Sequence, residues 1–147
     1  MSTTSVQDSS LFQRLQRETT AEVRFDEFSR GLYSTDASIY QIKPLGVVVP
    51  KTEQDVLATL SIANDAGVSV TMRGAGTSQC GQTVGEGLIV DVSKHLHRLI
   101  SVDVENHRTV VQPGIVLDQL NAQLKPHGLF FAVDVSTSSR ATIGGMT

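Results

Sequence analysis

The stretch from Thr71 to Gly87, TMRGAGTSQCGQTVGEG, contains five of the chain's twelve glycines and directly follows an apolar run that is typical of a β-strand. Glycine allows positive φ and lets the backbone approach an anion closely, so a glycine-rich loop after a strand often binds a nucleotide phosphate. Several kinds of loop do this, and they belong to different folds. The kind of loop formed here therefore decides both the fold and the function.

Two common nucleotide loops do not match this stretch. A Walker loop needs a lysine after its last glycine, and GAGTSQCGQ contains none. A Rossmann loop needs a third glycine where Gln79 stands, followed by a helix whose N-terminus binds the pyrophosphate. Gly81, Gly85 and Gly87 interrupt the residues before the next strand, and each would destabilise a helix by about 1 kcal/mol relative to alanine. We therefore expect no helix directly behind the loop.

The remaining possibility is a loop whose own successive N–H groups form a concave anion site. Gly74 and Gly76 would let the backbone approach an oxyanion, and Thr77 and Ser78 could each donate a hydroxyl hydrogen bond. Many neutral donors with a single arginine, Arg73, suit a diphosphate buried between two lobes. The alternative is a flexible surface connection that binds nothing.

The residues around the loop predict a small parallel lobe. Apolar runs at 45–50 (LGVVVP) and 68–73 (VSVTMR) are expected to be strands. The helix expected between them has Thr52 as its N-cap, and Val56, Leu57, Leu60 and Ala63 fall on one face. Strand, helix and strand at this spacing form a right-handed parallel βαβ unit, and residues 87–96 add a third strand.

A second lobe with antiparallel strands is expected after it, so that the whole chain is α+β. Its predicted elements are a hairpin over 99–114 that turns at 105–107, a short helix over 115–128 and a strand over 129–134. The chain stops at ATIGGMT without a closing element. We therefore expect this lobe to be incomplete and the chain to be the N-terminal piece of a larger protein.

Residues 1–44 are predicted to lie outside the nucleotide-binding domain, which we place at 45–147. A short amphipathic helix is expected to begin at Ser10 and to bury Leu11 and Leu15. The polar and aromatic residues 24–44 show no clear periodicity, so an irregular arm that covers the domain is expected there.

Composition limits the possible settings and partners. The net charge is −3 and no Lys/Arg cluster is present, which argues against nucleic acid as a partner. The N-terminus does not resemble a signal peptide, and no apolar run is long enough to form a transmembrane segment. Cys80 is the single cysteine, so no internal disulfide can form. Together these features predict a cytoplasmic protein.

Three segments resemble a known family: PLGVVVPKTEQDV (44–56), VTMRGAGTSQCGQTVGEGLIVDVS (70–93) and VDVSTSSRATIGG (133–145). They are similar to the FAD-binding domain of the vanillyl-alcohol oxidase/p-cresol methylhydroxylase (PCMH-type) superfamily. Within it, the likeness is to the 2-hydroxy-acid branch of FAD-linked D-lactate, glycolate and D-2-hydroxyglutarate dehydrogenases. RGLYSTDASIY (30–40) is similar to the same branch, and the resemblance covers roughly residues 28–147.

The resemblance implies a two-lobed PCMH-type fold and a set of FAD contacts. The pyrophosphate would be wrapped by Arg73, Gly74, Ala75, Gly76, Thr77 and Ser78, and the loop would continue past the ribityl chain with Gly81 and Gln82. Pro50 would lie beside the adenosine half, Asp134, Ser136 and Thr137 near the flavin ring, and Thr142, Gly144 and Gly145 at the phosphate and ribityl region. The chain departs from the family at Cys80, often serine, and at Val135, often proline.

Single polar residues point to no further chemistry. No carboxylate pair, Ser/His/Asp set or metal cluster stands out, so the catalytic residues stay unknown, no metal is expected and the chemistry must come from a cofactor. His95 and His97 lack a third ligand and are expected on a solvated basic edge rather than at a metal. Cys80 is expected to be a small packed residue, the alternatives being a flavin link or a redox thiol.

The resemblance implies a function that the residues alone do not. The chain would be the FAD-binding portion of a flavin-dependent oxidoreductase that oxidises a small 2-hydroxy acid by hydride transfer to flavin. Binding would be non-covalent, because the glycine loop has no histidine to carry the flavin. The catalytic acid/base group would lie outside this chain, and an electron-acceptor domain or subunit would be a partner. The alternatives are a non-catalytic FAD- or nucleotide-binding module and an inactive truncated gene product.

Overall fold

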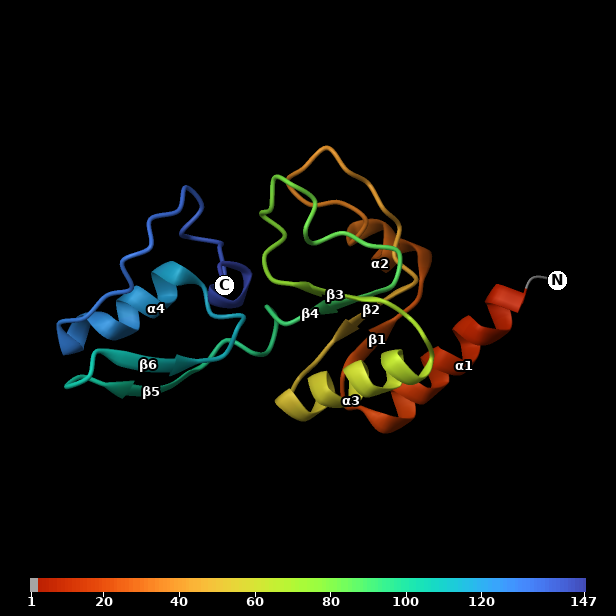
Figure 1. Cartoon of the computed structure of the whole chain (residues 1–147), viewed down its shortest axis with the longest axis horizontal. Helices are drawn as coiled ribbons and strands as arrows, with labels where there is room; N and C mark the ends of the chain where they lie inside the picture. Colours follow the sequence, from red (N-terminus) through yellow and green to blue (C-terminus); the bar gives the residue numbers. More distant parts are fainter. Residues whose placement is uncertain (1–2) are drawn as a thin grey trace.

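The structure is a computed structural model that describes the backbone of residues 3–147 and the side chains from residue 10 onward. Its strands form a four-stranded sheet and a separate two-stranded sheet. Figure 1 shows the two sheets side by side, with helices α1 and α3 packed beneath the larger sheet and helix α4 above the smaller one. The predicted two-lobed arrangement is present.

The larger sheet has the strand order β1-β2-β4-β3. Strands β2 (Gly46–Val49) and β3 (Val70–Arg73) each pair in parallel with the strand between them, β4 (Leu88–Asp91). Every residue of β2 and β4 is buried, as expected for central strands of a parallel sheet that is covered on both faces. The prediction of a small parallel lobe is confirmed.

Helix α3 (Glu53–Asp65) connects β2 to β3 and begins with the predicted cap at Thr52. The Thr52 side chain accepts from the Asp55 backbone N–H, and the Asp55 side chain accepts from the Thr52 N–H, which forms a capping box. The buried face differs from the prediction. Asp55, Thr59, Ile62 and Ala63 are buried, whereas Leu57 is 64% exposed, because the face that meets the sheet is rotated relative to the apolar stripe.

Helix α1 (Thr3–Glu18) packs against α3 and completes the main core. Leu11 and Leu15 are buried there with Ile62, Leu88 and Val90, as the amphipathic pattern predicted. The helix begins at Thr3, so Ser10 lies within it and is not its N-cap. The apolar residues that indicated the helix, among them Leu11 and Leu15, lie in its C-terminal half, and for that reason they could not locate the start.

The arm is less irregular than predicted. It contains strand β1 (Glu22–Arg24), which pairs antiparallel with β2, and helix α2 (Glu27–Leu32), which is capped by Asp26. The Asp26 carboxylate accepts a hydrogen bond from the Ser29 N–H at 2.8 Å. A three-residue strand and a six-residue helix are too short to show a period in sequence, and β1 exists only because β2 offers it an edge.

The second lobe contains the predicted hairpin and helix. Strands β5 (Leu99–Asp103) and β6 (Arg108–Val111) are antiparallel, and helix α4 (Leu117–Leu124) packs on them through a small core that includes Ile115, Leu120 and Leu124. Two 3₁₀ turns follow, η1 (Lys125–His127) and η2 (Ile143–Gly145).

The strand predicted over residues 129–134 does not form. Phe130 is 72% exposed, and the Phe131 N–H donates to the Asn121 side chain of α4 at 2.7 Å instead of to a neighbouring strand. A strand requires a hydrogen-bonding partner along its edge, and none of the described residues supplies one here. The apolar run alone therefore gave the wrong prediction.

Candidate functional site: a cavity between the glycine loop and the T-I-G-G turn

A cavity of about 490 Å³ lies between the two lobes. One wall is formed by the glycine loop, residues 74–83, which follows the carboxyl end of β3. The other wall comes from the second lobe, around the T-I-G-G turn at residues 142–145. In Figure 1 the green loop after β3 faces the blue segment at the C-terminal end. Crevices at the carboxyl ends of parallel strands are the usual ligand sites of such sheets.

Most of the residues that sequence analysis singled out line this cavity. They are Gly74, Ala75, Gly76, Thr77, Ser78, Gln82, Thr137, Thr142 and Gly145. The lining also includes residues that the motifs did not indicate, namely Thr83, Val135, Ala141, Met146 and Thr147. All but Thr147 adjoin a predicted site residue along the chain, so proximity to the motifs was the available signal.

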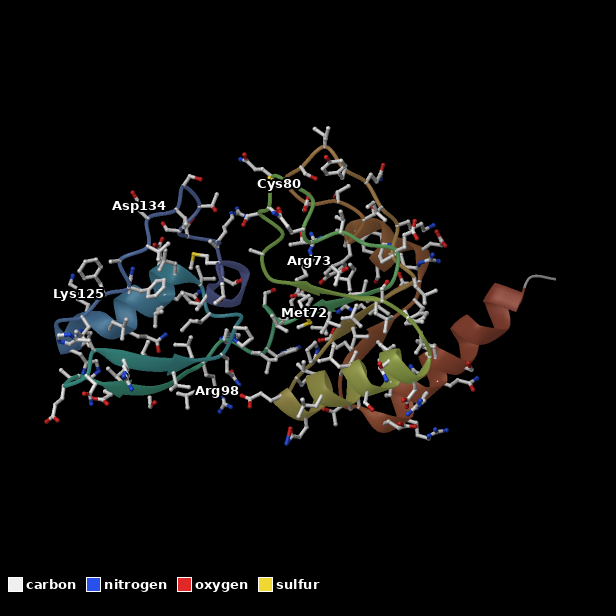
Figure 2. All side chains as sticks on the ribbon, in the orientation of Figure 1. Met72, Arg73, Cys80, Arg98, Lys125 and Asp134 are labelled. Atoms are coloured by element: carbon white, nitrogen blue, oxygen red, sulfur yellow. The ribbon has the colours of Figure 1, made fainter. Side chains whose placement is uncertain are left out.

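The other selected residues lie outside the lining: Pro50, Arg73, Gly81, Asp134, Ser136 and Gly144. Pro50 is buried at the end of β2, and Gly144 donates its N–H to Pro113 O at 2.8 Å. Asp134 is exposed, and Figure 2 shows it on the outer part of the second lobe. The structure thus brings the two central motifs together. Of the three predicted flavin-ring residues, only Thr137 lines the cavity.

The two loop glycines that line the cavity have no room for a side chain. Gly76 has φ +69, and a Cβ there would lie 2.5 Å from Arg73 Nη2. Gly74 has no positive φ, but a Cβ on it would overlap Thr142 Oγ1 across the cavity. The predicted conformational freedom is therefore needed at Gly76, whereas at Gly74 the need is for close approach of the two walls.

The polar groups of the cavity are neutral. Its lining contains no acidic or basic side chain. Thr142 is 2% exposed, and its hydroxyl oxygen has no hydrogen-bond partner among the described residues. The Ser78 hydroxyl is engaged within the loop, where it bonds the Gln82 side chain and accepts from the Cys80 N–H at 3.2 Å. A buried hydroxyl without a partner is costly, and a ligand in the cavity is one group that would satisfy this one.

Arg73 points away from the cavity. Its Nη1 donates to Thr83 O at 3.2 Å and its Nη2 to Thr35 O at 2.9 Å, while the guanidinium lies 5.2 Å from the centroid of the Tyr33 ring. Tyr33 in turn donates its hydroxyl to Asp91 Oδ2 at 2.6 Å in the interior. Burial, together with this bond to Asp91, raises the pKa of Tyr33, so the phenol stays protonated.

The sequence that forms this cavity matches a known family. Residues 44–147 match the family described as FAD binding domain. The chain belongs to that family. FAD is its cofactor. The cavity fits part of such a molecule, because its glycine backbone leaves space that side chains would fill and because it is lined by a buried hydroxyl without a hydrogen-bond partner among the described residues.

Similar proteins include one named as a dehydrogenase and one named as an oxidase subunit. The chain is 43% identical over 128 residues to a protein of Pseudomonas putida named D-2-hydroxyglutarate dehydrogenase, and the match covers 85% of this chain and 13% of that protein. It is 36% identical over 126 residues to glycolate oxidase subunit GlcD of Bacillus subtilis, covering 82% of this chain and 27% of that one. The chain therefore spans only a small part of the relatives it matches.

Solved structures share the fold at lower identity. Alkyldihydroxyacetonephosphate synthase superposes with a TM-score of 0.81 at 20% identity, covering 93% of this chain and 30% of that one. p-Cresol methylhydroxylase superposes with a TM-score of 0.67 at 16% identity, covering 84% of this chain and 25% of that one. The expected PCMH-type fold is confirmed.

The histidine and cysteine side chains considered as candidate ligands lie outside the cavity lining. His95 and His97 are exposed, as expected for a solvated basic edge, and His95 Nε2 lies 2.9 Å from Glu22 Oε1 of β1. Cys80 is exposed on the glycine loop rather than packed (Figure 2). Within residues 3–147, no group of three His, Cys, Asp or Glu is placed to hold a metal. None of the helices in the described part of the chain is long and apolar enough to cross a membrane.

Proposed function

We propose that this chain is the FAD-binding portion of a flavin-dependent oxidoreductase that oxidises a small 2-hydroxy acid. The observation that carries the proposal is the buried, unpartnered hydroxyl of Thr142 opposite Gly74, at the point where the glycine loop and the T-I-G-G turn meet. The names of the relatives, D-2-hydroxyglutarate dehydrogenase and glycolate oxidase subunit, support the substrate class. The division into residues 1–44 and a FAD-binding domain at 45–147 agrees with the matched range.

The chain's part in the reaction is to hold and orient the cofactor. The backbone of residues 74–78, with the hydroxyls of Thr77, Ser78 and Thr142, would bind the pyrophosphate through neutral donors. The pyrophosphate would be shielded from water because both walls of the cavity contribute to it. Bound FAD supplies the ring that accepts a hydride from the α-carbon of the substrate.

The positions outside the cavity complete the proposed site. Pro50 would lie beside the adenosine half and Gly81 beside the ribityl chain. Asp134 and Ser136 would lie near the flavin ring, and Gly144 would shape the T-I-G-G turn through its bond to Pro113. Binding would be non-covalent, since the loop contains no histidine. The site of action would be the cytoplasm, with an electron-acceptor domain or subunit as partner.

Ligand binding tests the first half of the proposal. The purified chain is titrated with FAD and, separately, with riboflavin, which lacks the pyrophosphate, while flavin fluorescence is followed. FAD should bind far more tightly than riboflavin, and denaturation should release all of the flavin. Equal binding of both flavins would show that the loop does not hold the pyrophosphate, and flavin retained after denaturation would point to a covalent link such as one through Cys80.

Reduction of the bound flavin tests the second half. The complete oxidoreductase that contains this chain is mixed anaerobically with D-2-hydroxyglutarate, glycolate or D-lactate, and the visible absorbance of the flavin is recorded. One of the three should bleach it. FAD binding without bleaching by any 2-hydroxy acid would favour a non-catalytic FAD-binding module.

A further inference from the structure

Residues 33–41 of the arm, which we call the strap, pack along one side of the glycine loop and form hydrogen bonds with it. The strap makes four contacts here, one with Arg73 at the end of β3 and three with the loop itself. They are Arg73 Nη2 to Thr35 O at 2.9 Å, Thr83 Oγ1 to Asp36 Oδ2 at 3.0 Å, Ala37 N to Gly76 O at 3.2 Å, and the Tyr40 ring, which lies 2.6 Å from where a Gly81 Cβ would be. The strap precedes the residues that match the FAD binding domain family, 44–147.

Arg73 lies at the centre of this fastening. Its guanidinium bridges two backbone carbonyls, one on the strap at Thr35 and one on the loop at Thr83, and it rests over the ring of Tyr33. It also fills the space beside Gly76 that a side chain would otherwise occupy. A planar group with several fixed donors is suited to such bridging, whereas an ammonium group is not.

The strap itself is anchored in the interior. Tyr33 is buried and donates to the Asp91 carboxylate at the end of β4, and Asp91 also accepts from the Ser93 N–H at 2.9 Å and from the Ser93 hydroxyl at 2.6 Å. A continuous path of contacts thus runs from the central strand through Tyr33 and Arg73 to the backbone of the loop.

From this geometry we propose that Arg73 is a positioning residue that acts through the strap: it holds the glycine loop in its binding shape before FAD arrives, and it does not itself bind the pyrophosphate. This rests on the proposed FAD site. A glycine-rich loop loses much conformational entropy when it is ordered, and that cost would weaken binding if it fell at the moment of association. Because the strap orders the loop when the protein folds, this entropy is lost before FAD binds and does not weaken the association.

The first test measures the loop in the absence of flavin. Amide hydrogen exchange is followed over residues 74–83 in the unaltered chain, in Arg73→Met and in Arg73→Lys, with Arg14→Met as a matched control. Arg14 pairs with Glu18 and Asp65 between α1 and α3 and does not touch the loop. Arg73→Met should speed loop exchange at least about tenfold while the amides of α3 stay as protected as before. Arg73→Lys should resemble Arg73→Met, and Arg14→Met should leave the loop unchanged.

Unchanged loop exchange in Arg73→Met would overturn the proposal. If Arg73→Met also exposes α3, a second variant decides. Asp36→Ala removes the bond to Thr83 and leaves Arg73 in place. It should speed exchange in the loop alone, and the proposal fails if it does not.

The second test compares FAD affinity in the same variants. Arg73→Met should weaken FAD binding by about ten- to a hundredfold, the loss expected for hydrogen bonds made by a charged group. Because lysine keeps the charge but not the bridge, Arg73→Lys should not restore affinity. If Arg73→Lys restored FAD affinity and neither variant changed the exchange of the loop amides, Arg73 would be a phosphate ligand, which contradicts the proposal. If the unaltered chain binds no FAD, the proposed function fails, while hydrogen exchange still decides whether Arg73 positions the loop.

Discussion

Gly76 combines two constraints that a substitution would break together. Its φ of +69 lies in the left-handed region, and the Arg73 guanidinium occupies the place of a side chain. Valine there would be strained by about 1–3 kcal/mol and would displace Arg73 from its carbonyl partners. We therefore expect Gly76→Val to abolish FAD binding, measured as loss of bound flavin absorbance, while the core stays folded.

The matched control for Gly76→Val is Gly67→Val. Gly67 has φ +65 after helix α3, so the backbone strain is similar, but nothing lies within 4 Å of its Cβ position. This variant should lose stability and keep its FAD affinity. If Gly76→Val retained flavin at the level of Gly67→Val, the glycine loop would not be the pyrophosphate site.

Substitution of Thr142 should affect the stability of the flavin-free chain and its FAD affinity in opposite directions. Its buried hydroxyl has no partner among the described residues, so Thr142→Val, which keeps the shape, should leave the flavin-free chain equally stable or more stable by up to about 1–3 kcal/mol. FAD affinity should fall about tenfold, since the hydroxyl would be satisfied only by the cofactor. Thermal unfolding with and without FAD measures both effects.

Thr59→Val is the control for this prediction. Thr59 in α3 is also fully buried with an unpartnered hydroxyl, but it lies in the first lobe away from the cavity. The two substitutions should have similar effects on stability, and only Thr142→Val should weaken FAD binding. Weakened binding in both variants would show that the effect is not local to the site.

At the scale of elements, Asp55 joins helix α3 to the segment between α1 and β1. Its carboxylate accepts from the Thr20 N–H at 2.7 Å, from the Thr20 hydroxyl at 2.9 Å, and from the N–H groups of Lys51 and Thr52, each at 3.0 Å. Burial alone would raise the pKa of Asp55, but hydrogen bonds from Thr20, Lys51 and Thr52 outweigh it, and the pKa is lowered.

Asp55→Asn should destabilise the chain by about 1–3 kcal/mol at neutral pH, because the amide NH₂ would face N–H donors. A lowered folded pKa means that the charged carboxylate contributes its stability above the unfolded pKa, about 3.9, and loses it as the pH falls through the folded value. The difference in unfolding free energy between the two proteins should therefore shrink below about pH 4. A difference that stays constant down to pH 3 would contradict this account.

Elements with their own sequence signals were predictable, and elements created by contacts were not. The apolar runs of β2 and β4 and the Thr52 cap of α3 are encoded locally and appeared where expected. Strand β1 and the absent strand at 129–134 depend on whether an edge is available, and a sequence window does not contain that information.

The same division holds for the candidate site. The glycines indicated the loop wall of the cavity, because close approach and positive φ leave glycine as the suitable residue, whereas the T-I-G-G wall was indicated by the resemblance to the family. The direction of Arg73 could not be predicted, since its partner carbonyl at Thr35 lies 38 residues away in the chain. The motif therefore indicated which residues gather but not which of them face the ligand.

At the scale of the whole molecule, the width of the cavity depends on how the two lobes are held together. Gln112, at the end of β6, is 4% exposed and lies at their junction. Its Nε2 donates to Glu53 Oε1 of α3 at 3.2 Å, and its Oε1 accepts from the Arg98 N–H at 3.1 Å. Pro113, the next residue, accepts from the Gly144 N–H of the T-I-G-G turn at 2.8 Å. A bond between the lobes is thus one residue from the cavity wall.

Gln112→Ala should therefore affect both stability and binding. Loss of the bridge leaves the partly buried Arg98 N–H without its side-chain acceptor, which should cost about 1–3 kcal/mol in unfolding free energy. FAD would contact both lobes in the proposed site, so it should stabilise the folded variant by mass action, by about 2.7 kcal/mol when FAD is present at a hundred times its Kd. Gln123→Ala, the same change on the exposed side of α4, should alter neither quantity. The measurement is the melting temperature of each variant across a series of FAD concentrations. If FAD affinity were unaffected by Gln112→Ala, the cavity would not depend on the junction, and the glycine loop alone would bind the cofactor.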